Sequence, residues 1–126
     1  MVEPMDGLSK IGARATMLAA ARGVASAYPA SVELTPGDVP RGVPIHDAGD
    51  VWLHPTWKEL EFSPGQPHCF SFQFDSKNGV KRSKFTARAL GDLDGDGIFS
   101  QFSVSGEFEL GAEPVLNPIE IDHEVE

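Results

Sequence analysis

The chain has 126 residues, 40% of them hydrophobic, which is enough for one domain that buries a core without a disulfide or a metal. Its net charge of −9 argues against a nucleic-acid or anionic-lipid partner, because both need a basic surface. The single cysteine, Cys69, excludes an intramolecular disulfide, and its apolar neighbours indicate a buried thiol.

The first element that the sequence predicts is a helix over residues 7–28. Apolar residues recur along it at steps of three or four and form an alanine-rich stripe on one side (Leu8, Ile11, Ala15, Leu18, Ala21, Ala25). Asp6 is a suitable N-cap, and Pro29 ends the pattern. The stretch 15–27 also fits a short signal peptide, although Arg22 interrupts it. No apolar run reaches the ~20 residues that span a bilayer.

Residues 29–50 are predicted to form a loop, because several prolines interrupt this stretch (Pro36, Pro40, Pro44). A loop of this length in a small domain is often an interaction surface. The next segment carries Trp52 and Trp57, which we expect to anchor the core. One short helical turn is expected after Pro55.

Residues 60–126 form the predicted sheet region, with about four strands over residues 68–74, 84–90, 98–108 and 116–125. The first strand alternates Phe70, Phe72 and Phe74 with other residues, a period of two that indicates one buried face. Turns at 75–79, 92–97 and 111–114 are short, which implies an antiparallel meander. One N-terminal helix packed on this sheet gives a single α+β domain over residues 1–126.

Charge is distributed unevenly along the chain. All Lys and Arg residues lie at or before Arg88, and five of them follow closely on one another (Lys77, Lys81, Arg82, Lys84, Arg88). Only acidic charges come later (Asp92, Asp94, Asp96, Glu107, Glu109, Glu113, Glu120, Asp122, Glu124, Glu126). This pattern fits ordinary clustering on a solvated surface, or a head-to-tail assembly in which the basic segment of one copy faces the acidic end of the next.

One turn has the spacing of a cation site. Asp92, Asp94 and Asp96 occupy positions 1, 3 and 5 of a loop with Gly97 at position 6, and the carbonyl of Ile98 falls at position 7. Because calcium takes oxygen ligands, we expect Asp92, Asp94, Asp96 and Ile98 to form a weak calcium site, and calcium is the only cofactor indicated. The alternative is a plain turn, built from Asp and Gly for their backbone preferences.

No group of residues indicates catalysis. The four histidines (His46, His54, His68, His123) are scattered without metal-ligand spacing, and the chain has neither a Gly-rich phosphate loop nor a nucleophile elbow. His68 precedes Cys69 directly, but neighbours in a strand point to opposite faces. We therefore expect a protein that is not an enzyme, with a structural, hydrogen-bonded role for His54.

Several segments resemble a subgroup of bacterial type IV pilins. The most specific are the Trp-containing segment 52–57 and the strand–turn–strand 85–102, with its Gly-Asp-Leu-Asp-Gly-Asp-Gly turn. Residues 6–12 are similar to the start of the periplasmic half-helix of these pilins, and residues 121–126 to their C-terminal strand. Residues 67–74 are similar as well, although those pilins tend to carry tyrosine where Cys69 stands. The resemblance covers most of the chain.

The resemblance implies a structural subunit of a type IV pilus or pilin-like filament, periplasmic before assembly and extracellular afterwards. Pilins begin with a leader and a long apolar helix, which this sequence lacks, either by truncation or because the subunit is naturally split. The implied partners are other pilin subunits or a short helix-only pilin partner, with no nucleic acid and no direct membrane span. The alternative function is an extracellular calcium-binding or adhesive module.

Overall fold

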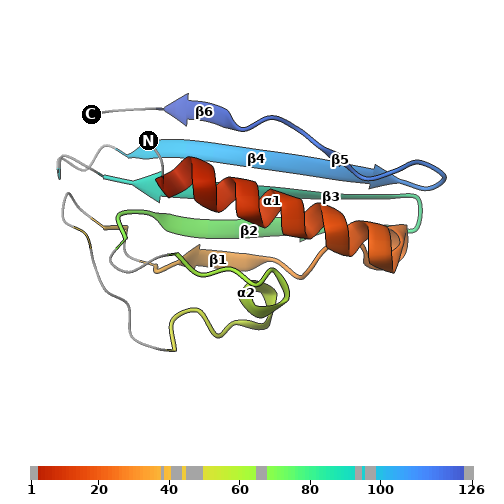
Figure 1. Cartoon of the computed structure of the whole chain (residues 1–126), viewed down its shortest axis with the longest axis horizontal. Coiled ribbons are helices and arrows are strands. Elements are labelled where there is room, and N and C mark those ends of the chain that lie inside the picture. The colour runs from red at the N-terminus through yellow and green to blue at the C-terminus, as the bar shows by residue number, and fades with distance from the viewer. Residues whose placement is uncertain are drawn as a thin grey trace.

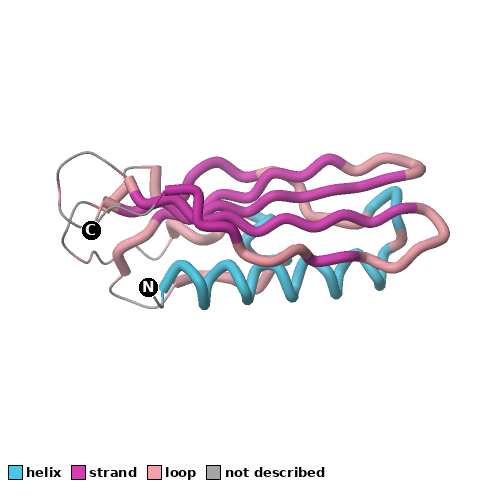
Figure 2. The backbone as a smooth tube through the Cα atoms, turned by 90° about the horizontal axis from the view of Figure 1, so that it is seen from above, coloured by secondary structure: helices cyan, strands magenta, loops and turns pink. Residues whose placement is uncertain are grey.

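The computed structural model describes residues 3–37, 39–40, 44, 50–64, 68–92, 95 and 99–123, with only the backbone at 122 and 123. One N-terminal helix packs against one face of an antiparallel sheet, which is the expected α+β arrangement (Figure 1, Figure 2). The sheet has six strands, so the expectation of about four was too low.

The additional strand at one edge of the sheet comes from the segment predicted as a loop. The strands follow one another in space as β1 (Val32–Thr35), β2 (Ser71–Lys77), β3 (Arg82–Gly91) and β4 (Ser100–Glu109), and the last of these pairs with both β5 (Val115–Leu116) and β6 (Glu120–His123). Residues 29–50 are therefore not all loop. Val32 is buried and pairs with Phe74, but four strand residues between two prolines are too few to show an alternation in the sequence.

The C-terminal strand predicted over 116–125 is two short strands, β5 and β6. Pro118 lies between them, and a proline has no N–H to donate to a ladder. The Asn117 N–H instead donates to the Ser105 carbonyl at 2.9 Å, which keeps this connection beside β4. The predicted boundaries of β2 were also shifted, because it begins at Ser71 and continues to Lys77 through part of the expected turn.

The helix predicted over 7–28 spans Glu3–Arg22 and is labelled α1. It ends early because Gly23 adopts φ 85°, a conformation that favours glycine, while its N–H donates to the Ala19 carbonyl at 3.0 Å. A 3-10 helix, η1 (Val24–Ser26), follows. Asp6 is not the N-cap, since it lies inside α1 and forms an ion pair with Lys10 at 3.1 Å.

The core lies between α1 and the facing side of the sheet. The helix buries Leu8, Ile11, Ala15 and Ala19, whereas the predicted stripe member Ala21 is exposed. The sheet contributes every second residue of three strands (Phe72, Phe74, Phe85, Ala87, Ala89, Phe102, Val104). Short side chains on the helix and phenylalanines on the sheet therefore share the space between the layers.

The tryptophan segment extends this core beside β1. It contains the short helix α2 (Pro55–Glu59), as expected after the proline, and Trp57 is only 1% exposed. The Trp57 Nε1–H donates to Thr35 Oγ1 at 3.1 Å, and the half-buried Trp52 ring lies 5.2 Å from the Trp57 ring between centroids. Trp57 is thus a core anchor, as predicted, and it ties α2 to the edge strand, whereas Trp52, predicted to be a second anchor, is only partly buried against the core.

Candidate functional site

The turn expected to bind calcium begins at the end of β3. Asp92 is fully buried, its N–H donates to the Pro40 carbonyl at 3.3 Å, and its own carbonyl accepts from the Gly95 N–H at 3.4 Å. Gly95 has φ 73°, as a tight turn requires. The other three proposed ligands, Asp94, Asp96 and Ile98, lie outside the described residues.

Within the part of the chain that the structure describes, no three His, Cys, Asp or Glu side chains are placed to share a metal ion. Because most of the 92–98 turn is not included in that statement, the calcium site stays a prediction. The burial of Asp92 was not predicted from the sequence. A buried carboxylate needs polar partners or a bound cation to compensate for lost hydration.

Two histidines have structural surroundings. His54 caps α2, since its Nδ1 accepts from the Thr56 N–H at 3.1 Å, which fits the structural role expected for it. His68 is buried, its Nδ1 lies 2.9 Å from the Phe70 carbonyl oxygen, and its ring meets Trp52 edge-on. His46 lies outside the described residues, and of His123 only the backbone is described.

Cys69 is half-buried and lies beside the carboxylate of Glu3. Burial, and secondarily the negative charge of Glu3, raises the pKa of the Cys69 thiol. A raised pKa lowers the thiolate fraction at neutral pH, which is the opposite of what activates a nucleophilic cysteine. Glu3 itself was not expected to have a role, since nothing local in the sequence signals a contact with a residue so far along the chain.

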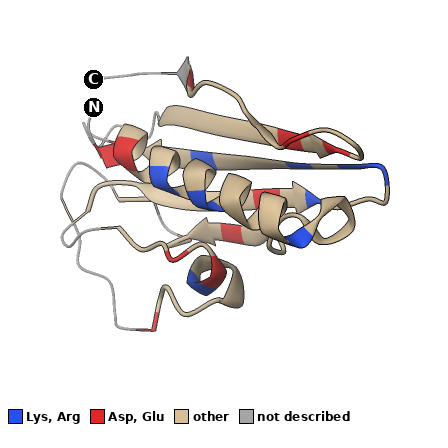
Figure 3. Cartoon of the chain, turned by 45° about the vertical axis from the view of Figure 1, so that its right-hand side comes forward, with Lys and Arg blue, Asp and Glu red and all other residues tan. Residues whose placement is uncertain are grey.

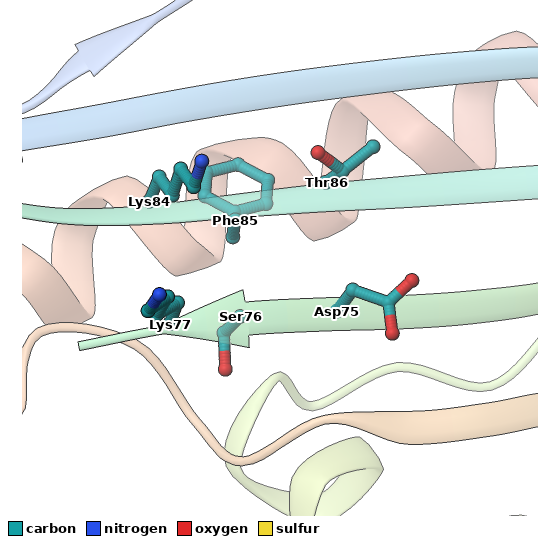
Figure 4. A pocket seen from close by; sticks show the side chains of 6 residues that line it. All are labelled: Asp75, Ser76, Lys77, Lys84, Phe85 and Thr86. Carbon is teal, nitrogen blue, oxygen red and sulfur yellow. The ribbon is translucent and has the colours of Figure 1, made fainter.

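The sheet face opposite α1 is not covered by α1 or α2 (Figure 2). On this face Asp75 forms an ion pair with Arg88, with 2.8 Å between the carboxylate oxygen and the guanidinium nitrogen. Thr86 lies opposite Asp75 in the register of β2 and β3. A shallow hollow of about 190 Å³ lies here between the two strands (Figure 4), lined by Asp75, Ser76, Lys77, Lys84, Phe85 and Thr86. Its lining mixes charged, polar and aromatic side chains.

Part of the basic segment is neutralised within the molecule. Arg82 pairs with Glu109 across β3 and β4. Lys84 lies opposite Glu107 in the same register, but these two described side chains form no ion pair with each other. Arg88 is occupied by Asp75, as described above. Positive charge nevertheless gathers at the turn between β2 and β3, next to acidic residues near the end of β4 (Figure 3).

Two apolar side chains at this end of the molecule were not singled out by the sequence. Val80, on the β2–β3 turn, is 76% exposed, and Leu110, on the β4–β5 turn, is 67% exposed. The Leu110 N–H donates to the Lys81 carbonyl at 2.8 Å, which holds the two turns together. The local signal that could have identified this surface is a valine within a turn rich in glycine and lysine.

No helix within the described residues is long and apolar enough to cross a membrane. Comparison of the chain with protein-family models, with curated proteins and with solved structures found no match. The surfaces and contacts above are therefore the basis for assigning a function.

Proposed function

We propose that this chain is the globular head of a type IV pilin-like filament subunit. In this role it acts by packing beside copies of itself or beside a helix-only partner, on the outside of the cell after a periplasmic stage. The sequence resemblance in the tryptophan segment and in the 85–102 strand–turn–strand first suggests this role.

The observation that carries the proposal is the way α1 is fixed to the sheet. Its apolar side packs on β3 and β4, and its first residue, Glu3, is bound to the backbone that precedes β2. Near its other end, Arg22 pairs with Glu59 of α2 at 2.6 Å. A helix held at both ends is a rigid platform, so an apolar helix joined to it or docked against it would hold the head at a defined angle.

The outward face of α1 also suits close packing against a neighbour. Lys10 begins this face, and Ala13, Met17 and Ala20 continue it with small or flexible exposed side chains. Short side chains let another backbone approach closely, and methionine adapts to an irregular partner surface. This feature supports lateral contacts between subunits.

The filament proposal is tested by locating the chain on the cell. Filaments sheared from cells that produce it are probed with an antibody against the head, and a strain without the gene, complemented or not, is the control. Gold labelling along the filaments is expected, and it should disappear with the gene. Recovery of the chain only from the soluble culture fraction, with filaments unchanged, would contradict the proposal.

The second candidate is an extracellular calcium-binding or adhesive module. The alternation of aspartates at 92–96 favours it, together with the positive φ of Gly95 inside that turn. Calcium binding and filament assembly are compatible, since a cation in a surface turn can order the loop that a neighbour contacts. The calcium experiment described in the Discussion separates a metal site from a plain turn.

A further inference from the structure

One end of the molecule concentrates unpaired positive charge. Lys77 and Lys84 are directly opposite each other in the β2–β3 pair, and Lys81 lies on the turn between these strands. All three are exposed, and within the described part of the chain none of them forms an ion pair. Like charges directly opposite in a sheet are destabilising. This arrangement in a chain of net charge −9 favours an acidic partner.

The same end carries the exposed Val80 and Leu110. We call Lys77, Val80, Lys81, Lys84 and Leu110 the basic tip. The hydrogen bond from the Leu110 N–H to the Lys81 carbonyl fixes its two turns relative to each other. A hollow of about 320 Å³ beside the tip is lined by Lys77, Asn78, Gly79, Arg82, Lys84 and Glu107. Cations around apolar side chains form a surface that matches an acidic strand with an apolar residue in it.

The chain itself contains such a strand, at the other end of the molecule. The strand β6 pairs with the first residues of β4, whereas the basic tip lies where β4 ends (Figure 1). Ile121 is 54% exposed, Glu120 is exposed, and the sequence continues with Asp122. In the described residues β6 pairs only with β4, so its outer edge has no strand partner. An unpaired strand edge exposes backbone N–H and C=O groups with which another chain can pair.

We propose that the basic tip of one copy binds the acidic strand β6 of a second copy. The lysines would face the acidic charge of the 120–122 segment, and Ile121 would contact Val80 and Leu110. The two surfaces lie at opposite ends of one molecule, so they meet only between copies. Such a heterologous contact leaves one surface of each kind free and repeats as an open chain.

This contact deepens the proposed filament role, on which it rests for its biological setting. The tip is small, so the contact between separate heads is weak. It becomes effective when a filament holds many heads at high local concentration. Exposed charges dominate it, which makes it sensitive to salt.

The test measures self-association of the whole chain by sedimentation velocity at low and high salt. Wild-type protein is expected to associate at low salt and to dissociate as salt is raised. The variant Lys77→Glu/Lys84→Glu and the variant Glu120→Lys/Asp122→Lys should each weaken association by about tenfold or more. Lys58→Glu is the matched control for the single reversal Lys84→Glu, because it makes the same charge change on an exposed residue of α2 and should leave association unchanged, whereas Lys84→Glu should weaken it.

Mixing the two charge-reversed variants gives the decisive result. The acidic tip of one variant is complementary to the basic β6 strand of the other, so association should return in the mixture. If the substitutions had weakened association by damaging the fold, mixing would not restore it. Failure of the mixture to associate overturns the contact, as does equal association of Lys84→Glu and the control Lys58→Glu. Binding of the tip to vesicles that contain phosphatidylglycerol, without association of heads, would also overturn it.

The outcome is separable from that of the filament proposal. Labelled filaments together with no rescue in the mixture would remove the tip contact and leave the filament role. Rescue in the mixture without labelled filaments would keep the tip contact and remove the filament role.

Discussion

Glu3 and Phe70 are hydrogen-bonded to each other although 67 residues separate them, with the Phe70 N–H 2.8 Å from Glu3 Oε2. The N–H of Cys69 donates to the same carboxylate, at 2.9 and 3.0 Å from its two oxygens. One side chain at the start of α1 thus binds the backbone just before β2, where the ladder to β3 has not yet begun. This contact couples the two layers of the fold at one end.

Replacing Glu3 should therefore destabilise the protein more than replacing other acidic residues of α1. Glu3→Ala is expected to lower the free energy of unfolding by about 2 kcal/mol, because charge-assisted hydrogen bonds are lost and backbone N–H groups remain unpaired. Glu3→Gln keeps one acceptor oxygen and should cost less. The control is Asp6→Ala, whose exposed ion pair with Lys10 contributes under about 1 kcal/mol. Equal losses for Glu3→Ala and Asp6→Ala in urea unfolding would contradict this role.

The two glycines in α1 should respond differently to the same substitution. A Cβ at Gly7 would lie 2.7 Å from a ring carbon of Phe72, which is fully buried and has no room to move. A Cβ at Gly12 would lie 2.9 Å from a methyl group of the partly exposed Leu116, which can rotate away.

Gly7→Ala should consequently cost about 1–3 kcal/mol by overpacking, even after the gain in helix propensity. Gly12→Ala should be neutral or stabilising by up to about 1 kcal/mol. Thermal unfolding of the pair decides the matter. If Gly7→Ala proves as stable as Gly12→Ala, the close approach of α1 to β2 is not as described.

Tyr28 should reduce stability at high pH. Burial of its ring, with a smaller effect of the charge on Glu107, raises its pKa to about 12 from an ordinary value of 10.0. The raised pKa means that the native state retains a proton that the unfolded chain loses above pH 10. The contribution of the protonated Tyr28 to the free energy of unfolding is complete below pH 10. It disappears as the pH rises towards 12, a loss of about 2 kcal/mol.

This titration is directly observable, because the chain has a single tyrosine. Tyrosinate absorbance should appear near pH 12 in the native protein and near pH 10 in denaturant. Tyr28→Phe should remove this part of the pH dependence. At pH 7 that substitution should cost little, since within the described residues the hydroxyl is buried without a hydrogen-bond partner. Native absorbance that rises near pH 10 would show that the ring is solvated.

The thiol of Cys69 should react slowly with iodoacetamide near neutral pH. Burial and the neighbouring Glu3 charge raise its pKa, so the reactive thiolate is scarce. Reaction should accelerate in guanidinium chloride and, more modestly, in Glu3→Gln, which removes the charge. A native rate equal to that of the unfolded chain would indicate an exposed, unperturbed thiol.

Calcium is expected to stabilise the protein if the 92–98 turn is a site. With a weak dissociation constant on the order of 10⁻⁴–10⁻³ M, 10 mM calcium would add about 1–3 kcal/mol, visible as a rise in Tm relative to chelator. Asp94→Ala should abolish the rise, whereas Glu113→Ala, outside the turn, should retain it. An unchanged Tm of the wild-type protein would indicate a plain turn that binds no calcium. A rise that survives Asp94→Ala would place the ligands elsewhere.

The elements of this fold were largely readable because their patterns are local. The alternation of Phe70, Phe72 and Phe74 and the three-to-four spacing of Leu8, Ile11 and Ala15 each identify a buried face within a few residues. The helix ends before Gly23 and not at the predicted Pro29, because a glycine ends a helix when its backbone adopts positive φ, which the sequence alone does not reveal. β1 was missed because its pairing with β2 is made across a long stretch of intervening chain.

The spacing of neighbouring residues predicted most of the secondary structure, the two-layer class and the amphipathic faces, whereas the strand over 32–35 and the division of the C-terminal strand into two were not predicted. The tertiary structure determines which distant groups meet. It brought Glu3 to Phe70, joined the turns of Val80 and Leu110, and placed β6 at the far end from the basic tip. These relationships depend on the path of the whole chain, because a strand order and the end of a sheet at which a turn lies are not properties of any local segment.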